Sequence, residues 1–265
     1  MRLSLCMIVK NEEEYLPKCL ASAKPWVDEI VIVDTGSTDR TVRIAESFGA
    51  RVLHFPWTGD FSAARNCSLD AATGDWIMFL DADEEIVDED GPKLRDLLAQ
   101  PGYSGWYVNL ISFVGDKPGQ EAVGNVAFRL FTNHPKHRFT GRLHEQVVAA
   151  VQLNGGQIGF SNVRLNHYGY LNKPTIEKNK LSRNFEILLK EVEDRPEDPF
   201  VHFNLGVEYM RQGKSEEALH SYQQAFKRLP TLEIAYASVL VRNIVLCLNN
   251  LKRFDEALKV LKDAV

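Results

Sequence analysis

The sequence has few cysteines, and they follow no metal-binding or redox pattern. The four cysteines are scattered along 265 residues, at Cys6, Cys19, Cys67 and Cys247. None has the C-x-x-C spacing that a zinc site or a redox dithiol requires. Small secreted domains that depend on disulfides carry more cysteines, at closer spacing. We therefore expect reduced cysteines that serve in packing, and a cytoplasmic protein.

Long hydrophobic runs are also missing. The first apolar segment, residues 3–9, is followed at once by the polar residues Lys10, Asn11 and Glu12. This run is too short for a signal peptide with its cleavage site, or for a membrane span of about 20 residues. No later segment is long enough either. The sequence predicts a soluble protein without integral membrane association.

Positive charge is not in excess. The chain has 31 lysines and arginines against 36 acidic residues, a formal net charge of −5. This balance disfavours nucleic acid as a partner, because a surface that binds phosphate backbones needs a surplus of cations. Hydrophobic residues at 45% and charged residues at 25% are typical of a globular chain. The length predicts one large domain and a smaller one.

The first part of the sequence alternates between strand and helix patterns. Apolar runs predict strands at residues 3–9, 29–33, 51–55 and 76–80, and helices at 11–23, before Gly49, and at 61–72. Strands that alternate with single helices form a mostly parallel sheet with right-handed crossovers. We therefore predict a doubly wound, Rossmann-like α/β domain with helices on both faces of its sheet.

After residue 88 the pattern changes to consecutive strands. A helix at residues 92–99 is followed by strand-like segments at 106–113, 123–131 and 157–165. Strands that follow one another without a helix form hairpins, so the second half of the sheet is predicted to be mixed.

A helical tail begins at about Thr175. Residues 202–230 match the tetratricopeptide consensus at Leu205, Gly206, Tyr209, Ala218, Tyr222, Ala225 and Pro230, and a degenerate second copy follows. We place the domain boundaries at 1–172 and 173–265. Because about three repeats normally make a stable solenoid, the tail is expected to pack on the first domain, to form a homo-oligomer, or to belong to a longer array.

Polar residues follow three of the predicted parallel strands. Val9 and Asn11 end the first strand, Asp34 and Thr35 the second, and the sequence Asp81-Ala82-Asp83 the fourth. In open parallel sheets ligands bind beyond the carboxyl ends of the strands. The sequence therefore predicts a nucleotide site at this edge.

Asp81 and Asp83 are the strongest candidates for metal ligands. Two carboxylates at the buried end of a hydrophobic strand are costly unless a cation neutralises them. Mg²⁺ or Mn²⁺, held by one or two carboxylates together with waters and substrate phosphates, fits this pattern. A solvated surface loop is the alternative for an isolated D-x-D, and the position after a core strand favours the metal.

Three segments resemble family-2 glycosyltransferases of the GT-A fold. They are IVIVDTGSTDRT at residues 30–41, ARN at 64–66 and GDWIMFLDADE at 74–84. With RLHEQ at 142–146 and the repeat tail, the chain is most similar to the branch of sublancin-type peptide glycosyltransferases and lipopolysaccharide-core glucosyltransferase-like proteins. The resemblance covers roughly the first 170 residues. It implies a metal-dependent, inverting enzyme that moves a hexose from a UDP-sugar to a peptide, protein or glycan acceptor.

The resemblance also implies roles for individual residues in donor binding. Asp34 would contact the base or ribose, and Arg65 the base or the diphosphate. The family often has a second acid where this chain has Thr35, so the hydrogen bond of that acid to the base is not expected here. The predicted nucleotide-sugar set comprises Val9, Asn11, Asp34, Thr35, Arg65, Asp81, Ala82, Asp83 and Arg142. Alternatively, Asp34 supports the turn at Gly36 and Arg65 has a structural role in its helix.

Inverting transfer requires a general base that faces the donor across the acceptor site. By resemblance Glu145 is the candidate, with His144 as its rival. In the alternative, Glu145 forms a scaffold ion pair with Arg142 or Arg138. His167 is a candidate third metal ligand beside Asp81 and Asp83, or a diphosphate contact, as a late histidine is in some GT-A enzymes; a packed, hydrogen-bonded histidine is the alternative.

The alternatives to a glycosyltransferase are a non-catalytic interaction protein and a nucleotidyltransferase. A non-catalytic interaction protein would bind a partner through its repeats and keep only a degenerate nucleotide-sugar domain, but the intact Asp81, Asp83 and Glu145 argue against this. A nucleotidyltransferase would need a glycine-rich loop with Lys or Arg after its first strand, which the chain lacks. Concave helical repeats commonly bind extended chains, which favours a peptide or protein acceptor.

Overall fold

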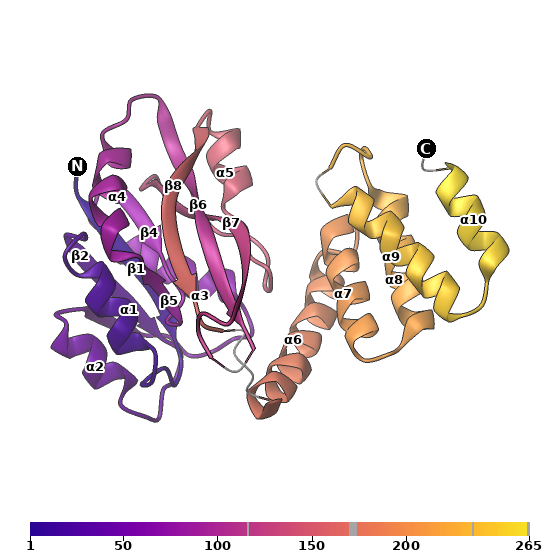
Figure 1. The fold of residues 1–265 in the computed structure, drawn as a ribbon, viewed down its shortest axis with the longest axis horizontal. Helices are drawn as coiled ribbons and strands as arrows, with labels where there is room; N and C mark the ends of the chain where they lie inside the picture. The colour runs from indigo at the N-terminus through magenta and orange to yellow at the C-terminus, as the bar shows by residue number, and fades with distance from the viewer. Residues whose placement is uncertain (116, 170–173, 235, 264–265) are drawn as a thin grey trace. The chain divides into compact units, whose positions relative to one another are not determined.

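The computed structural model describes residues 1–115, 117–169, 174–234 and 236–263. It divides into two compact units, Met1–Lys173 and Pro174–Val265, which are coloured in sequence order in Figure 1. The predicted boundary between residues 172 and 173 falls outside the described residues.

The first unit is built on an eight-stranded sheet with the order β3-β2-β1-β4-β7-β6-β8-β5. Within the group β1 to β4, each pair of adjacent strands is parallel, as predicted. The strands are β1 (Leu3–Val9), β2 (Glu29–Asp34), β3 (Arg51–His54), β4 (Trp76–Phe79), β5 (Glu84–Ile86), β6 (Tyr103–Val114), β7 (Glu121–Thr132) and β8 (Gln157–His167).

Helices cover both faces of this sheet, which confirms the predicted fold class (Figure 1). On one face, α1 (Leu16–Ala23) and α4 (Gly91–Leu98) pack their leucines on alternate residues of β1 and β4, and α2 (Thr41–Ser47) packs at the edge of the same core. On the other face, α3 (Phe61–Ala71) and α5 (Val148–Leu153) pack against the remaining residues. Strands buried on both faces explain the continuous apolar runs in the sequence.

The first helix begins later than predicted. The sequence predicts helix from Asn11, but α1 starts at Leu16. Asn11 has a φ of 56°, a left-handed conformation that asparagine tolerates and that a right-handed helix excludes. Instead, Asn11 Oδ1 accepts a hydrogen bond from the Thr38 backbone N–H at 2.8 Å, and the Glu12 N–H donates to Thr41 Oγ1 at 2.7 Å. The loop after β1 is thus joined to the loop after β2.

The second half of the sheet is mixed, as predicted. β6 and β7 form a long antiparallel hairpin, and β7 pairs antiparallel with β4. β8 returns parallel to β6, and its last residues pair with the short strand β5, where Glu84 lies opposite His167. β5 and α5 were not predicted, because they span three and six residues and are too short to show a period. β5 brings the end of the domain next to the Asp81-Ala82-Asp83 segment.

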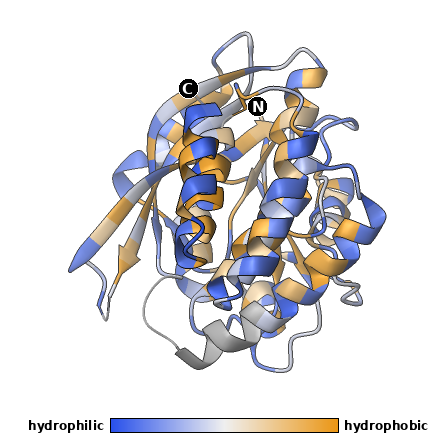
Figure 2. Ribbon diagram, turned by 90° about the vertical axis from the view of Figure 1, so that its right-hand side faces the viewer, coloured by the Kyte–Doolittle hydropathy of each residue, from blue (hydrophilic) through white to orange (hydrophobic). Residues whose placement is uncertain are grey.

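The second unit is helical and contains the predicted repeats. Its helices are α6 (Pro174–Asp194), α7 (Pro199–Arg211), α8 (Ser215–Arg228), α9 (Ala237–Asn250) and α10 (Phe254–Asp263). Gly206 of α7 faces the ring of Tyr222 of α8, and a Cβ at this position would lie 2.5 Å from that ring. Only glycine allows this approach. Figure 2 shows hydrophobic and hydrophilic residues interleaved along the helices, the pattern of amphipathic helices around a small core.

In the described part of the chain, none of the helices combines the length and apolar composition that a membrane crossing requires.

Candidate active site

The predicted nucleotide edge is formed by the adjacent ends of β2, β1 and β4. Thr35 is buried, and its hydroxyl donates to the Val9 carbonyl at 3.1 Å. Ala82 is also buried, whereas Asn11 is exposed and holds the loop after β2. Val9, Thr35 and Asn11 therefore shape the floor of this edge through backbone and turn contacts.

Asp34 lies at the end of β2 and supports the turn that follows. Its carboxylate accepts hydrogen bonds from the backbone N–H groups of Gly36 and Ser37 at 3.2 and 3.1 Å. Gly36 has a φ of 104°, which favours glycine. His54, the cross-strand neighbour of Asp34 on β3, is exposed and places Nδ1 3.5 Å from Asp34 Oδ2. The turn role weighed for Asp34 is thus present; its contact with a nucleoside stays a prediction.

Arg65 joins Asp81 to Glu145. From α3, its Nη2 donates to Asp81 Oδ1 at 2.8 Å and its Nε donates to Glu145 Oε1 at 2.6 Å. The Arg65 side chain is only 8% exposed, and its guanidinium carbon lies 5.1 Å from the centre of the Phe79 ring. Among the described residues, Nη1 of Arg65 is buried without a hydrogen-bond partner. Arg65 is therefore a positioning group for both carboxylates.

The ion pair of Glu145 differs from the two that the sequence suggested. Glu145 pairs with Arg65, whereas Arg138 pairs with Asp70 at 2.8 Å and Arg142 lies 4.0 Å from Asp60. The sequence did not suggest Arg65 as the partner of Glu145, because the two residues are far apart in the chain. Arg65 is on α3, and Glu145 follows β7.

The segment that carries Glu145 is held on α3 by several hydrogen bonds. The Asn66 side chain exchanges two hydrogen bonds with the backbone of Phe139, at 2.9 and 3.0 Å. Ser62 Oγ donates to the Gly141 carbonyl at 2.6 Å, and the Phe61 N–H donates to the Arg142 carbonyl at 2.9 Å. These contacts explain why the ARN and RLHEQ segments, far apart in sequence, meet at one site.

His144 precedes Glu145 in an unusual backbone conformation. Its φ is 56°, which costs free energy in a residue other than glycine. His144 is exposed at the pocket rim, and its carbonyl accepts a hydrogen bond from Gln146 Nε2 at 3.2 Å. The strained turn directs the next residue, Glu145, back toward Arg65.

A second buried ion pair, which the sequence did not predict, lies beneath Asp81. Glu84 is 1% exposed, and Arg129 of β7 donates to both of its oxygens, at 3.0 and 2.7 Å. Glu84 also accepts the Asp81 backbone N–H at 3.1 Å, and Arg129 Nη2 lies 3.5 Å from Asp81 Oδ2. This pair fixes the turn that carries Asp81 and Asp83. A glutamate after D-x-D and an arginine in a strand give no sequence signal of this contact.

The charges around Asp81 shift its protonation. Burial by itself would raise the pKa of Asp81, but the positive charges of Arg65 and Arg129 more than offset it and hold that pKa well below its usual range. Burial raises the pKa of Glu84, an effect that Arg129 opposes only in part. Asp81 is therefore an anion whose two oxygens each face a guanidinium group.

Asp83 and His167 converge at the end of β8. Asp83 Oδ2 lies 3.6 Å from His167 Nε2, and the other ring nitrogen, Nδ1, lies 3.0 Å from Ser112 Oγ. A Cβ built on Gly169 would lie 2.4 Å from Asp83 Oδ2 and 2.7 Å from His167 Nε2. Because Gly169 has no side chain, the space between the Asp83 carboxylate and the His167 imidazole is not filled by a Cβ.

These two donors fit a divalent cation that keeps other ligands. Among the described residues, no three His, Cys, Asp or Glu side chains form a metal-binding cluster. A carboxylate and an imidazole, oriented by a hydrogen bond to Ser112, suit Mg²⁺ or Mn²⁺ that retains waters and substrate phosphates. Of the three predicted ligands, the structure brings Asp83 and His167 together and directs Asp81 toward Arg65 and Arg129.

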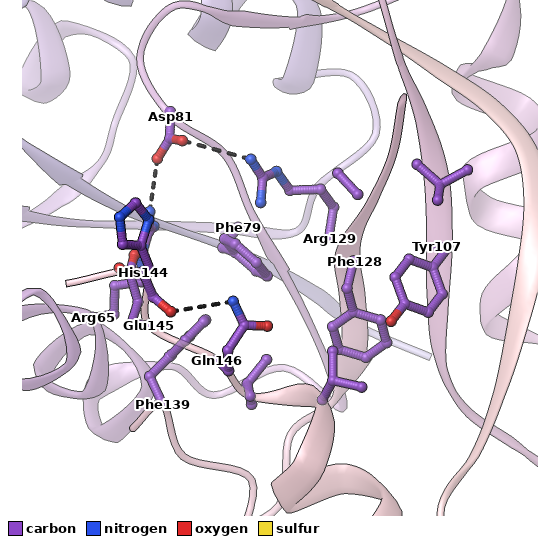
Figure 3. Close-up of a pocket in the computed structure, with 14 residues that line it drawn as sticks. Arg65, Phe79, Asp81, Tyr107, Phe128, Arg129, Phe139, His144, Glu145 and Gln146 are labelled. Carbon is purple, nitrogen blue, oxygen red and sulfur yellow. Dashed lines mark hydrogen bonds and ion pairs between the residues drawn. The ribbon is translucent and has the colours of Figure 1, made fainter. Parts of the chain in front are cut away.

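A cavity of about 420 Å³ opens beside Asp81 and Glu145, the two carboxylates that Arg65 bridges (Figure 3). One side is charged, and the other is aromatic and aliphatic. The charged and polar lining residues are Arg65, Asp81, Arg129, His144, Glu145 and Gln146, and the apolar ones include Phe79, Tyr107, Val126, Phe128, Phe139, Val147 and Val148. A cavity with convergent polar groups, next to the carboxyl ends of parallel strands, is the usual position of a ligand site in an α/β fold.

Comparison with known proteins assigns this arrangement to a family. A family model described as "Glycosyl transferase family 2" matches residues 4–152, and a tetratricopeptide repeat model matches residues 199–232. The chain belongs to glycosyltransferase family 2. The matched region contains the ends of β1, β2 and β4 together with Arg65 and Glu145, whereas His167 of the candidate metal pair lies beyond it.

Curated relatives share both parts of the chain. A TPR repeat-containing protein of Synechococcus elongatus is 38% identical over 237 residues, covering 86% of this chain and 57% of the relative. The SPbeta prophage-derived glycosyltransferase SunS of Bacillus subtilis is 28% identical over 218 residues, covering 80% of this chain and 50% of SunS. The chain spans about half the length of these relatives.

Solved structures share the fold. The S. aureus TarS fragment 1–349 aligns with a TM-score of 0.59 at 15% identity, covering 98% of this chain and 90% of the fragment. At this identity the likeness concerns the fold, a GT-A glycosyltransferase domain followed by helices. The predicted family and fold are confirmed.

Proposed function

We propose that this glycosyltransferase is an inverting, metal-dependent enzyme that moves a hexose from a UDP-sugar to a peptide, protein or glycan acceptor. The observation that carries the proposal is the cavity lined by both Asp81, at the donor edge of the sheet, and Glu145, on the segment held by α3. A donor-edge carboxylate and a candidate basic carboxylate on the charged side of one cavity suit a sugar whose anomeric carbon is attacked by the acceptor while the diphosphate leaves from the opposite face.

The donor would lie across the ends of β1, β2 and β4. Asp34 and Thr35 would contact the nucleoside, with Asn11 and Val9 shaping the floor, Asp81 and Ala82 near the ribose and sugar, and Arg142 at the rim. The S. aureus TarS fragment, which shares the fold, has also been solved in complexes with UDP and with UDP-GlcNAc. This agrees with a uridine nucleotide as the donor.

Glu145 would act as the general base and His144 is its rival. The acceptor heteroatom forms a bond to the anomeric carbon while the bond from that carbon to the β-phosphate oxygen breaks. The acceptor proton passes to Glu145, and the electron pair leaves with the diphosphate. Arg65 would hold the carboxylate in place through its 2.6 Å hydrogen bond.

Asp83 and His167 would hold Mg²⁺ or Mn²⁺. The cation would supply Lewis-acid stabilisation of the departing diphosphate. The contribution of this chain is orientation: Ser112 fixes the imidazole through Nδ1, and Gly169 leaves space in front of both donors.

Calorimetric titration of UDP, with and without Mn²⁺, tests the donor site. The wild type is expected to bind UDP more tightly with Mn²⁺ than without it and to bind GDP weakly. Asp83→Ala is expected to lose the Mn²⁺-dependent part of the affinity, whereas Asp88→Ala, an exposed acid nearby, is expected to keep it. A wild type that binds neither nucleotide would contradict the proposal and favour an interaction protein.

A further inference from the structure

An apolar surface continues from the cavity onto the sheet. Phe160 of β8 is 72% exposed and Val126 of β7 is 55% exposed. The Phe160 ring stacks on Tyr107 of β6, with centroids 4.9 Å apart and an interplanar angle of 12°. Tyr107, Val126 and Phe128 line the cavity, and Figure 3 shows Tyr107 and Phe128 there. The surface therefore leads from the cavity to the exposed Phe160. We call Tyr107, Val126, Phe128 and Phe160 the apolar platform.

The platform lies on one face of the sheet. Tyr107 is the cross-strand partner of Phe128 on one side and of Phe160 on the other, and directly opposed residues project to the same face. Val126 is two residues from Phe128 and shares that face. Val123, which pairs with Ser112, is three residues from Val126 and lies on the opposite face.

The charged side of the cavity has no surplus of positive charge. The two guanidinium groups, of Arg65 and Arg129, pair with the carboxyl groups of Asp81, Glu145 and Glu84. An acceptor with a phosphate or carboxylate at the reacting end would meet two arginines that are already paired with carboxylates, and two of these acids, Asp81 and Glu145, line the cavity. Charge complementarity therefore favours a neutral or cationic acceptor.

The apolar side disfavours a hydroxyl-rich acceptor. Val126, Val147 and Val148 offer no side-chain hydrogen bonds, and a buried hydroxyl without a partner is unfavourable. An apolar or aromatic side chain gains free energy on the same surface, and a contiguous exposed apolar patch typically marks an interaction site. The chemistry fits a peptide better than a glycan.

Resting on the proposed function, we infer that the acceptor is an extended peptide and that the platform binds an apolar or aromatic side chain beside the modified residue. The cavity takes the side chain that receives the sugar, near Glu145. The platform takes its neighbour, and Phe160 and Val126 determine this specificity.

Paired synthetic peptides test the inference. Each pair differs only in Phe or Ser next to the acceptor position, which is an equimolar mixture of Ser, Thr, Cys and Asn. With UDP-glucose or UDP-GlcNAc, we expect the wild type to glycosylate the Phe peptides at least about tenfold more efficiently in kcat/KM. Phe160→Ser and Val126→Ser should each reduce this preference several-fold.

Val123→Ser is the matched control, because Val123 is 53% exposed on the same strand but on the opposite face. It should keep the preference unchanged, and UDP titration of each variant checks that the donor site is intact. Equal use of Phe and Ser peptides by the wild type, or equal losses in Val123→Ser and Val126→Ser, would overturn the inference. So would transfer to maltose-type oligosaccharides with none to peptides, although the proposed function would then stand. A wild type that neither binds UDP nor hydrolyses a UDP-sugar would overturn both.

Discussion

At the scale of single residues, the site depends on carboxylates that share two arginines. Arg65 holds Asp81 and Glu145, and Arg129 holds Glu84 and faces Asp81. Removing one partner of a buried ion pair leaves the other charge uncompensated. Substitutions that keep the hydrogen bonds are therefore the informative ones here.

The substitution Glu145→Gln tests whether Glu145 or His144 acts as the general base. Glutamine keeps a carbonyl oxygen that can accept from Arg65 Nε, so UDP affinity should remain within about twofold, while kcat falls by about 10²–10⁴ because no group removes the acceptor proton. Steady-state transfer assays and UDP calorimetry measure the two effects. His144→Gln should change kcat by less than about tenfold. If kcat instead fell by about 10²–10⁴ in His144→Gln and not in Glu145→Gln, His144 would be the general base.

The sequence identified the acidic residues of the site but not their partners. Asp81, Asp83 and Asp34 were found because they directly follow apolar strands, and strand ends meet at one edge. Glu84 and Arg129 were missed, because a contact between a turn and a strand of a later hairpin leaves no spacing pattern. The partner of Glu145 was missed for the same reason.

At the scale of elements, regular patterns were predicted well and short or strained segments were not. β1 to β4 and the β6–β7 hairpin were predicted from hydrophobic period. The start of α1 was placed too early, since the acidic residues after Asn11 resemble a first helical turn while the left-handed φ of Asn11 and its hydrogen bonds to the next loop prevent one. β5 and α5 were not predicted, because segments of three and six residues are too short to show a hydrophobic period.

Asp90 joins a 3₁₀ turn to β8 through an ion pair with Arg164, and the strength of this connection depends on pH. It lies in the 3₁₀ turn Asp88–Asp90, and Arg164 of β8 donates to it at 2.7 Å. Hydrogen bonds from Arg164 lower the pKa of Asp90 to about 2, below the unfolded value of about 3.9. The folded carboxylate therefore stabilises the domain above pH 4, by about 2 kcal/mol, and this contribution is lost as the pH falls from about 4 to about 2.

Asp90→Asn should lower the free energy of unfolding at pH 7 by about 2 kcal/mol or more. The difference from wild type should shrink between pH 4 and pH 2, as measured by urea unfolding at each pH. Asp96→Asn, at an exposed position on α4, is the control and should change little. A loss that is the same at pH 2 and pH 7 would show that charge is not the cause.

At the scale of the whole molecule, two units have separate hydrophobic cores. The sheet packs its cores with α1, α2 and α4 on one face and α3 and α5 on the other, and the repeats have their own core around Tyr222. Both parts match known families, and the match to relatives about twice as long includes both.

Gly206→Ala tests whether the cores are independent. The new Cβ would lie 2.5 Å from the Tyr222 ring, so the repeats should be destabilised by about 1–3 kcal/mol. We expect a lower-temperature transition in calorimetric melting, with UDP affinity unchanged. Gly124→Ala, where a Cβ meets nothing within 4 Å, is the control. A single melting transition that shifts as a whole would argue that the units unfold together.

The pairing of β5 with β8 has a consequence for synthesis on the ribosome. Glu84 and His167 are direct neighbours in the sheet, although the chain between them forms α4, the β6–β7 hairpin, a loop and α5. At about 5–20 residues per second, Asp83 emerges roughly 4–17 s before His167 can join it. Closing such a distant pair is entropically slow, so the nascent chain has the ends of β1, β2 and β4 well before Asp83 and His167 come together. Under the proposed function, nucleotide present during translation would therefore meet a half-built pocket, and activity would appear only when β8 closes the sheet.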